Sequence, residues 1–162
     1  MGNETLQKIL QQREIKTTDD IIFRTIFDVL SALFTDENHL STLRSGYTIN
    51  DHQQVWFPNI TLPQRLATEI KKGYANYMAP DGQYLYQFDS TKALSKRKKL
   101  GEQQIQKQTQ FVTFAKLNEK EMGIGYYFVG IFCFDGYTDE DCQTMIYKKI
   151  ADLYHLPNLK QF

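Results

Sequence analysis

Helical periodicity dominates the first third of the chain. Residues 4–14 place their apolar side chains on one side of a short polar helix. Thr17, Thr18 and Asp19 favour a helix N-cap, and they stand immediately before a stronger apolar pattern. That pattern predicts a helix over residues 19–34 whose apolar side chains cover more than half of its circumference, so we expect it to pack against a sheet.

From Gln54 onward the apolar period changes towards two, which is the period of a β-strand. Residues 55–57 (VWF) predict a short strand that is closed by a proline. A second proline suits the first turn of a helix over residues 62–74. Residues 79–83 (APDGQ) have the composition of a tight turn, and residues 84–88 (YLYQF) form the next expected strand.

The strongest strand signals lie in the second half of the chain. Residues 91–108 are weakly periodic and fit either a loop or an exposed helix. Residues 111–117 and 126–134 have the highest β-propensity of the chain and are joined by a hairpin-like stretch. We expect the later strand to be central, with both faces covered, and Gly130 to mark a close approach of a neighbouring backbone or ring.

The segment 138–154 is compatible with two structures. Thr138 followed by Asp141 resembles a helix-capping pattern, and the apolar spacing after it suits a helix. Residues 144–150 (TMIYKKI) also alternate well enough for a strand.

Helices first and strands later predict an α+β domain with a mostly antiparallel sheet or small barrel. We expect one compact domain, in which a helical part formed by residues 1–53 packs on a β part formed by residues 54–162. Apolar residues make up 41% of the 162, which is typical of a globular chain, and none of their runs approaches the roughly 20 residues of a membrane helix. Because the polar N-terminus lacks the apolar stretch of a secretion signal, we expect a cytoplasmic protein.

Charge is divided unevenly along a chain whose formal net charge is zero. Residues 58–120 carry eleven Lys or Arg against five Asp or Glu, whereas the parts before and after are acidic. At the centre of the basic part stands the block Lys96, Arg97, Lys98 and Lys99. Such a block predicts contacts with nucleic-acid phosphates, because these depend on local rather than total charge; a solvated surface segment is the alternative.

The sequence offers no recognisable catalytic chemistry. It contains no GxSxG elbow, P-loop, GxGxxG or HExxH motif, and its three histidines stand in separate segments without partners at metal-ligand spacing. We therefore expect a protein that is not an enzyme and that needs no metal or other cofactor.

Aromatic residues near basic sequence are the remaining candidates for function. Trp56 lies beside a proline turn, and Tyr84 and Tyr86 alternate in a strand shortly before the basic block. Rings in such a place suit base stacking, or a pocket that holds a base extruded from a duplex. The alternative is that most of the rings belong to the core.

Several blocks together resemble the C-terminal reader domain of modification-dependent restriction endonucleases that act on hydroxymethylated cytosine. They follow one another in the order of that family, and they are VWFP (55–58), Gly82 to Gln87, FVTFAK (111–116), YYFVGIFCFD (126–135) and MIYKKI (145–150). The resemblance implies a PUA-like or SRA-like fold for residues 54–150, with a strand over the last block, and a pocket that receives a flipped modified cytosine. It leaves residues 1 to about 50 uncovered.

The resemblance also implies roles for individual residues. Trp56 matches a Trp that lines the family's pocket, and Gln87 falls where the family has an acidic residue that can contact the base edge. An amide cannot replace a carboxylate in every hydrogen bond, so the base preference of this chain is open. A second Trp and an Asn of the family's pocket have no clear counterpart in residues 59–72.

Two functions follow as hypotheses. The first is a non-catalytic nucleic-acid-binding module, with DNA as the expected ligand, that reads modified cytosine by base flipping. It places Trp56, Tyr84, Tyr86 and Gln87 near the pocket and the block from Lys96 to Lys99 on phosphates. The second is a protein-interaction or inhibitory factor of a defence or mobile-element system, which contacts an effector nuclease or another protein through its acidic ends or the helix over residues 19–34.

Overall fold

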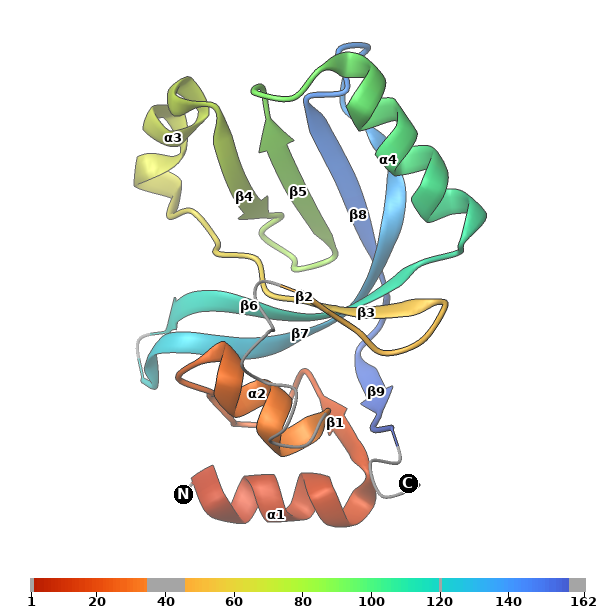
Figure 1. Cartoon of the computed structure of the whole chain (residues 1–162). Coiled ribbons are helices and arrows are strands. Elements are labelled where there is room, and N and C mark those ends of the chain that lie inside the picture. The colour runs from red at the N-terminus through yellow and green to blue at the C-terminus, as the bar shows by residue number, and fades with distance from the viewer. Residues whose placement is uncertain (1, 35–45, 120, 158–162) are drawn as a thin grey trace.

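The computed structural model describes residues 2–34, 46–119 and 121–157 (Figure 1). The helices are α1 (Gly2–Gln12), α2 (Ile26–Leu33), a 3-10 turn (Pro63–Arg65) that leads into α3 (Leu66–Lys72), and α4 (Leu94–Gln106). The strands are β1 (Glu14–Lys16), β2 (Gly46–Thr48), β3 (Gln53–Trp56), β4 (Tyr74–Met78), β5 (Tyr84–Asp89), β6 (Gln110–Glu119), β7 (Gly123–Tyr137), β8 (Thr144–Ala151) and β9 (Leu153–His155).

Seven strands form one sheet in the order β2-β3-β6-β7-β8-β5-β4. All neighbours are antiparallel except β3 and β6, which run parallel. The sheet curves but is not closed into a barrel, so of the two predicted forms the curved sheet is present. The segment after β3 forms backbone hydrogen bonds with two strands that are not neighbours in the sheet. Ile60 N donates to Lys116 O of β6 at 3.2 Å, and Thr61 N donates to Asn76 O of β4 at 2.8 Å.

The long strand β7 joins the two halves of the molecule. Figure 1 shows α1, α2, β1 and β9 on one side of β6 and β7, and α3, β4, β5 and α4 on the other. The β7–β8 register shifts twice, and Gly130 near the first shift has a φ of +126°. A Cβ at Gly130 would lie 2.8 Å from the carbonyl oxygen of Ala151, which confirms the predicted close approach.

Two hydrophobic clusters occupy the two sides of the sheet. The larger one packs α1, α2 and β9 against β3, β6 and β7, and includes Val29, Leu30, Val112 and Phe114. The smaller one, on the side of α4, is built on Leu85, Phe111, Phe132, Met145 and Tyr147. The central strand β7 contributes residues to both clusters, as predicted for a strand with both faces covered.

The predicted strands over residues 55–57, 84–88, 111–117 and 126–134 are confirmed, with boundaries that differ by a few residues. Residues 144–151 form strand β8, as the family resemblance implied, and not a helix. Residues 91–108 contain helix α4. The helix expected over residues 62–74 ends at Lys72, because Gly73 takes a left-handed conformation and the chain continues into β4.

The prediction of a helix over residues 19–34 is wrong in its first half. The helix begins only at Ile26, and Thr25 is its N-cap, with Oγ1 accepting from Asp28 N at 3.0 Å. Before it, Phe23 pairs with Tyr126 through two backbone hydrogen bonds of 3.0 and 2.7 Å. Apolar residues in this stretch are therefore buried by an extended chain on the edge of β7, which periodicity alone does not distinguish from a helix.

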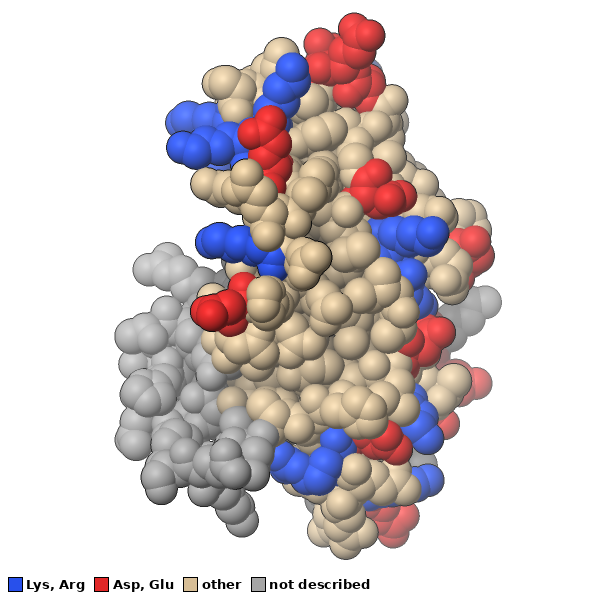
Figure 2. Space-filling view, turned by 90° about the vertical axis from the view of Figure 1, so that its right-hand side faces the viewer, with Lys and Arg blue, Asp and Glu red and all other residues tan. Residues whose placement is uncertain are grey.

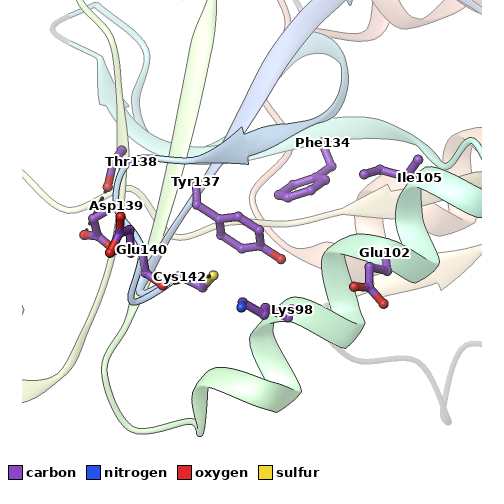
Figure 3. A pocket seen from close by; sticks show the side chains of 9 residues that line it. All are labelled: Lys98, Glu102, Ile105, Phe134, Tyr137, Thr138, Asp139, Glu140 and Cys142. Carbon is purple, nitrogen blue, oxygen red and sulfur yellow. Dashed lines mark hydrogen bonds between the residues drawn. The ribbon is translucent and has the colours of Figure 1, made fainter.

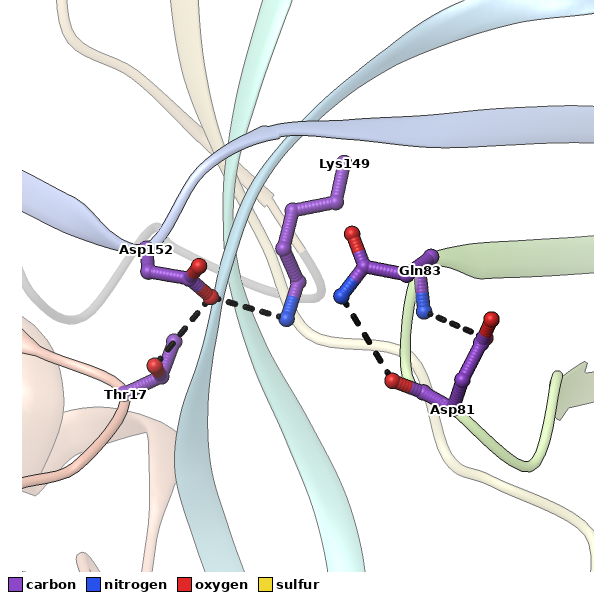
Figure 4. A network of polar contacts seen from close by, with 5 residues as sticks. All are labelled: Thr17, Asp81, Gln83, Lys149 and Asp152. Atoms are coloured by element: carbon purple, nitrogen blue, oxygen red, sulfur yellow. Dashed lines mark hydrogen bonds and ion pairs between the residues drawn. The ribbon is translucent and has the colours of Figure 1, made fainter.

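Polar contacts tie the N-terminal segment to the end of the sheet (Figure 4). The carboxylate of Asp152 accepts from Lys149 Nζ at 3.0 Å and from Thr17 Oγ1 at 3.2 Å, and these bonds hold the pKa of Asp152 below its usual range. Lys149 N also donates to Gln83 O in the β4–β5 turn at 2.8 Å. These contacts and the pairing of β1 with β9 connect the N-terminal segment, the β4–β5 turn and the C-terminal strands.

Candidate nucleic-acid interface

Strands β4 and β5 have an inner face towards α4 and an outer face away from it. Opposite residues of an antiparallel pair share a face, and alternate residues of one strand do so too. Asn76 lies opposite Gln87, and Met78 lies opposite Leu85, a residue of the smaller cluster packed on the α4 side. The inner face therefore carries Asn76 and Gln87, whereas Tyr86 belongs to the outer face.

Tyr84 and Tyr86, both expected near the pocket, lie on the outer face. Tyr86 stacks on Tyr77 with ring centroids 5.0 Å apart, and Tyr84 stacks on Tyr86 at 6.4 Å. These three half-buried rings form a row on the outer face, on the opposite side of the strand from Gln87. Because successive strand residues point in opposite directions, Tyr86 and Gln87 are not available to the same small ligand.

Trp56 lies on the inner face. Its ring contacts Tyr147 with centroids 5.0 Å apart and Phe111 at 5.7 Å, and the side chain is partly exposed. On β8, Tyr147 lies opposite Leu85 and Met145 lies opposite Gln87, so all of them share the α4 side of the sheet. The structure thus brings Trp56 and Gln87 to one side of the sheet, as the prediction required.

Arg97 is buried, unlike the surface residue that the predicted contact with phosphate requires. The side chain is 2% exposed and points from α4 into the sheet. Nε donates to Cys142 O at 3.1 Å, Nη1 to Gln87 Oε1 at 3.1 Å, and Nη2 to Gln87 O at 2.9 Å and to Gln143 O at 3.0 Å. Its neighbours Lys96, Lys98 and Lys99 are exposed, so only these three of the block face solvent.

Close packing holds α4 against the sheet. A Cβ at Gly101 would lie 2.2 Å from the hydroxyl oxygen of Tyr137, and that hydroxyl donates to Arg97 O at 2.7 Å. The approach brings Gln104, one turn further along α4, to the Tyr147 side chain. Burial raises the pKa of Tyr147 to about 12, against the smaller opposing effects of a hydrogen bond with Gln104 and the charge of Arg97.

A group of polar side chains therefore lies between α4 and the sheet, and we name it the inner polar cluster. Its members are Tyr74, Asn76, Gln87, Arg97, Gln104 and Tyr147. Asn76 is 3% exposed; its Nδ2 donates to the Tyr74 hydroxyl at 3.2 Å, and its Oδ1 has no partner. In the described ranges, Asn76 Oδ1 and Gln104 Oε1 are the buried side-chain nitrogen or oxygen atoms that have no hydrogen-bond partner.

Asn76, Gln104 and Tyr147 escaped the sequence prediction. Strand β4 was not anticipated, because its first residue was assigned to the preceding helix and the following ones to no element. The usable signal was the alternation in YANYM, which places Asn76 and Met78 on one face of a strand. For Gln104 the sequence carried no signal beyond its place in a polar helix.

Charges around α4 are mixed rather than uniformly basic. Figure 2, which views the molecule from the right of Figure 1, shows basic and acidic side chains interspersed. An open hollow of about 790 Å³ lies between α4 and the end of β7 (Figure 3), with Phe134 and Tyr137 at its back. Lys98 shares its rim with Glu102, Asp139 and Glu140, so an anion there would meet three carboxylates.

The described ranges contain no group of three or more His, Cys, Asp or Glu side chains placed to hold a metal ion. Among their helices, none is long and apolar enough to cross a membrane.

Comparison with known proteins places the chain in a family. The family described as SRA, the SET and RING associated domain, matches residues 8–156. A solved structure titled "The 5-Hydroxymethylcytosine-Specific Restriction Enzyme AbaSI" superposes with a TM-score of 0.70 at 18% sequence identity, covering 96% of this chain and 46% of the other. No protein with a curated description matches. Because the match spans nearly the whole described fold, this chain belongs to the SRA domain family.

Proposed function

We propose that the domain binds DNA and holds a modified cytosine, extruded from the duplex, at the inner polar cluster. The observation that carries the proposal is the buried, unpartnered Oδ1 of Asn76, which lies opposite Gln87 on the face that also carries Trp56. Membership of the SRA family supports DNA as the ligand, and the similar fold of a restriction enzyme specific for 5-hydroxymethylcytosine supports the kind of base.

The chemistry of the cluster suits an extruded base. An unpartnered buried acceptor costs about 1–3 kcal/mol, and a ligand that donates to it recovers this energy on binding. The exocyclic amino group of cytosine is such a donor. Trp56 supplies an aromatic surface beside the cluster, which an extruded base needs for stacking.

Lys96 and Lys99 are proposed to contact the backbone phosphates, whereas Lys98 lies among carboxylates at the rim of the hollow. Both are exposed residues of α4, the helix that carries Arg97 of the cluster. Contacts of this kind set affinity and its dependence on salt, but they do not distinguish one base from another. We propose that the described residues bind DNA without cutting it.

The test measures binding to three duplexes that differ only at one cytosine, which is plain, methylated or hydroxymethylated. The expected result is that the modified duplexes bind more tightly, that affinity falls steeply with salt, and that Asn76→Ala removes the preference. Asn118→Ala is the matched control, because Asn118 is exposed and lies on β6. Equal affinity of the wild-type domain for plain and modified duplexes would remove the claim of modified-base recognition.

Extrusion has its own readout. A 2-aminopurine opposite the modified cytosine becomes more fluorescent when its partner leaves the stack. An increase with wild-type protein that Trp56→Ala diminishes is expected. An unchanged signal at saturating protein contradicts base flipping even if the domain prefers modified DNA.

A second candidate function is contact with a protein partner through α2. On this helix Phe27 is 55% exposed, whereas Val29, Leu30 and Leu33 are buried. At the start of β7, Ile124 is exposed to 58%, and Arg24 Nη1 donates to Ile124 O at 3.1 Å. Stoichiometric recovery of one protein by the wild type but not by Phe27→Ser, without DNA binding at low salt, favours this function over the first.

A further inference from the structure

We propose that Arg97 is a positioning residue that fixes the side-chain amide of Gln87 with its Nε2 as the donor presented to the base. The inference rests on the proposed function, because it assigns the hydrogen-bond pattern that the inner polar cluster offers to an extruded base. Arg97, the buried residue of the basic block, then determines base specificity and does not contact a phosphate.

The orientation of Gln87 follows from the chemistry of its neighbour. A guanidinium carries five donors and no acceptor, so the side-chain atom of Gln87 that faces Arg97 must be the oxygen. The bond from Nη1 to Oε1 is 3.1 Å long, and Nη2 binds the main-chain oxygen of the same residue at 2.9 Å. Arg97 therefore holds both the backbone and the side chain of Gln87, and Nε2 points away from the guanidinium.

Arg97 is held without an acidic partner. Within the described ranges the guanidinium makes no salt bridge, and its bonds go to three backbone carbonyls and to the Gln87 amide. Satisfying the carbonyls of Cys142, Gln143 and Gln87 is enough for a purely structural role. The fourth bond, to Oε1, has a consequence for the ligand that the other three do not have.

That consequence is a matched donor and acceptor on neighbouring strands. Asn76 and Gln87 are directly opposite, and Cβ atoms in such pairs are about 5 Å apart. Asn76 Nδ2 donates to the Tyr74 hydroxyl, whereas Oδ1 has no partner. Oδ1 is therefore an available acceptor beside the Nε2 donor of Gln87. The Watson–Crick edge of cytosine complements this pair with its amino group as donor and N3 as acceptor, whereas uracil and thymine reverse both.

The experiment compares 5-hydroxymethylcytosine with 5-hydroxymethyluracil at the same position. Both stand opposite an abasic site, so that neither must break a base pair to leave the helix. The two bases share the ring and the hydroxymethyl group and differ in the donors and acceptors at positions 3 and 4. The wild-type domain is expected to prefer the cytosine by about tenfold or more.

Two variants isolate the roles of the two residues. Gln87→Met keeps the length of the side chain but has neither the acceptor for Arg97 nor the donor for the base, so the preference should fall by about tenfold. Arg97→Lys keeps the charge but loses the planar fork, so the amide is free to turn and the preference should fall by a smaller factor. Circular dichroism and thermal melting ensure that each comparison is made on folded protein.

Two results overturn the proposal. One is a Gln87→Met variant that keeps the wild-type preference for the cytosine, and the other is an Arg97→Lys variant whose melting temperature falls while the preference is unchanged. In both cases the wild-type preference for hydroxymethylated over plain cytosine keeps the proposed function intact. Loss of that wild-type preference is instead the failure of the proposed function.

Discussion

The two faces of β4 and β5 carry different side chains, and those side chains differ in what they can do. On the outer face the rings of Tyr77, Tyr84 and Tyr86 stack on one another. On the inner face Asn76 lies opposite Gln87, which α4 contacts through Arg97, and one buried acceptor has no partner. The outer rings contact each other, whereas the inner cluster keeps a buried acceptor without a hydrogen-bond partner. An unmet hydrogen bond in a buried place is therefore a stronger sign of a site than aromatic residues near basic sequence.

The largest expected effect concerns the residue that closes the inner face. Arg97→Met leaves the carbonyls of Cys142, Gln143 and Gln87 without the donor that they share, so the free energy of unfolding should fall by about 3 kcal/mol or more. Urea titration measures it. Lys98→Met is the matched control, because Lys98 is exposed, and its effect should stay within about 0.5 kcal/mol. Similar losses in the two variants contradict the buried role of Arg97.

The comparison of the faces is tested next by ring removal. Trp56→Ala should weaken binding to a hydroxymethylated duplex by about tenfold or more, because stacking on an aromatic ring contributes roughly 1–3 kcal/mol per base. Tyr86→Ala removes a ring of similar size from the outer face, and its effect should stay below about twofold. Both are measured by fluorescence anisotropy at a temperature where circular dichroism shows folded protein. A larger loss for Tyr86 than for Trp56 places the ligand on the outer face.

A smaller effect should separate stability from binding. Asn76→Leu replaces an unpartnered buried amide by an apolar side chain of similar size, so the free energy of unfolding should rise by about 1 kcal/mol. The same substitution removes the acceptor for the base, and the preference for modified DNA should disappear. A variant that is less stable than the wild type shows that Oδ1 is satisfied in the free protein and is not kept for a ligand.

The smallest effect at neutral pH is expected from Tyr147. Burial raises its pKa to about 12, so the folded state holds the phenolic proton more tightly than the unfolded state does. Its contribution to stability is complete below pH 10 and is lost as the pH rises towards 12. Tyr147→Phe should reduce the loss of stability over this range, measured by urea titrations at pH 9 and pH 11. An identical pH dependence in the two proteins contradicts burial of the hydroxyl.

The sequence predicted most of the sheet but less of the site. The period-two stretches over residues 84–88, 111–117 and 126–134 became strands, because their β-branched and aromatic residues suit a pleated surface on any scaffold. The helix predicted over residues 19–34 was wrong in its first half. The apolar residues there fit helical spacing, although an extended segment buries them on β7. Strand β4 was missed because a short strand after a helix carries too few alternations to be recognised.

By itself, the sequence determined the α+β class, the strands of highest β-propensity and the order of blocks that identifies the family. The tertiary structure decided which side of each strand became the interior. Alternation divides a strand into two sets of residues, and the docking of α4, whose Arg97 binds Gln87, covers the set that contains Gln87. The tertiary structure also decided that Arg97 is buried. The sequence of the basic block does not predict that Arg97 is buried. The carbonyl groups that accept from it belong to residues 87, 142 and 143, which lie outside the block.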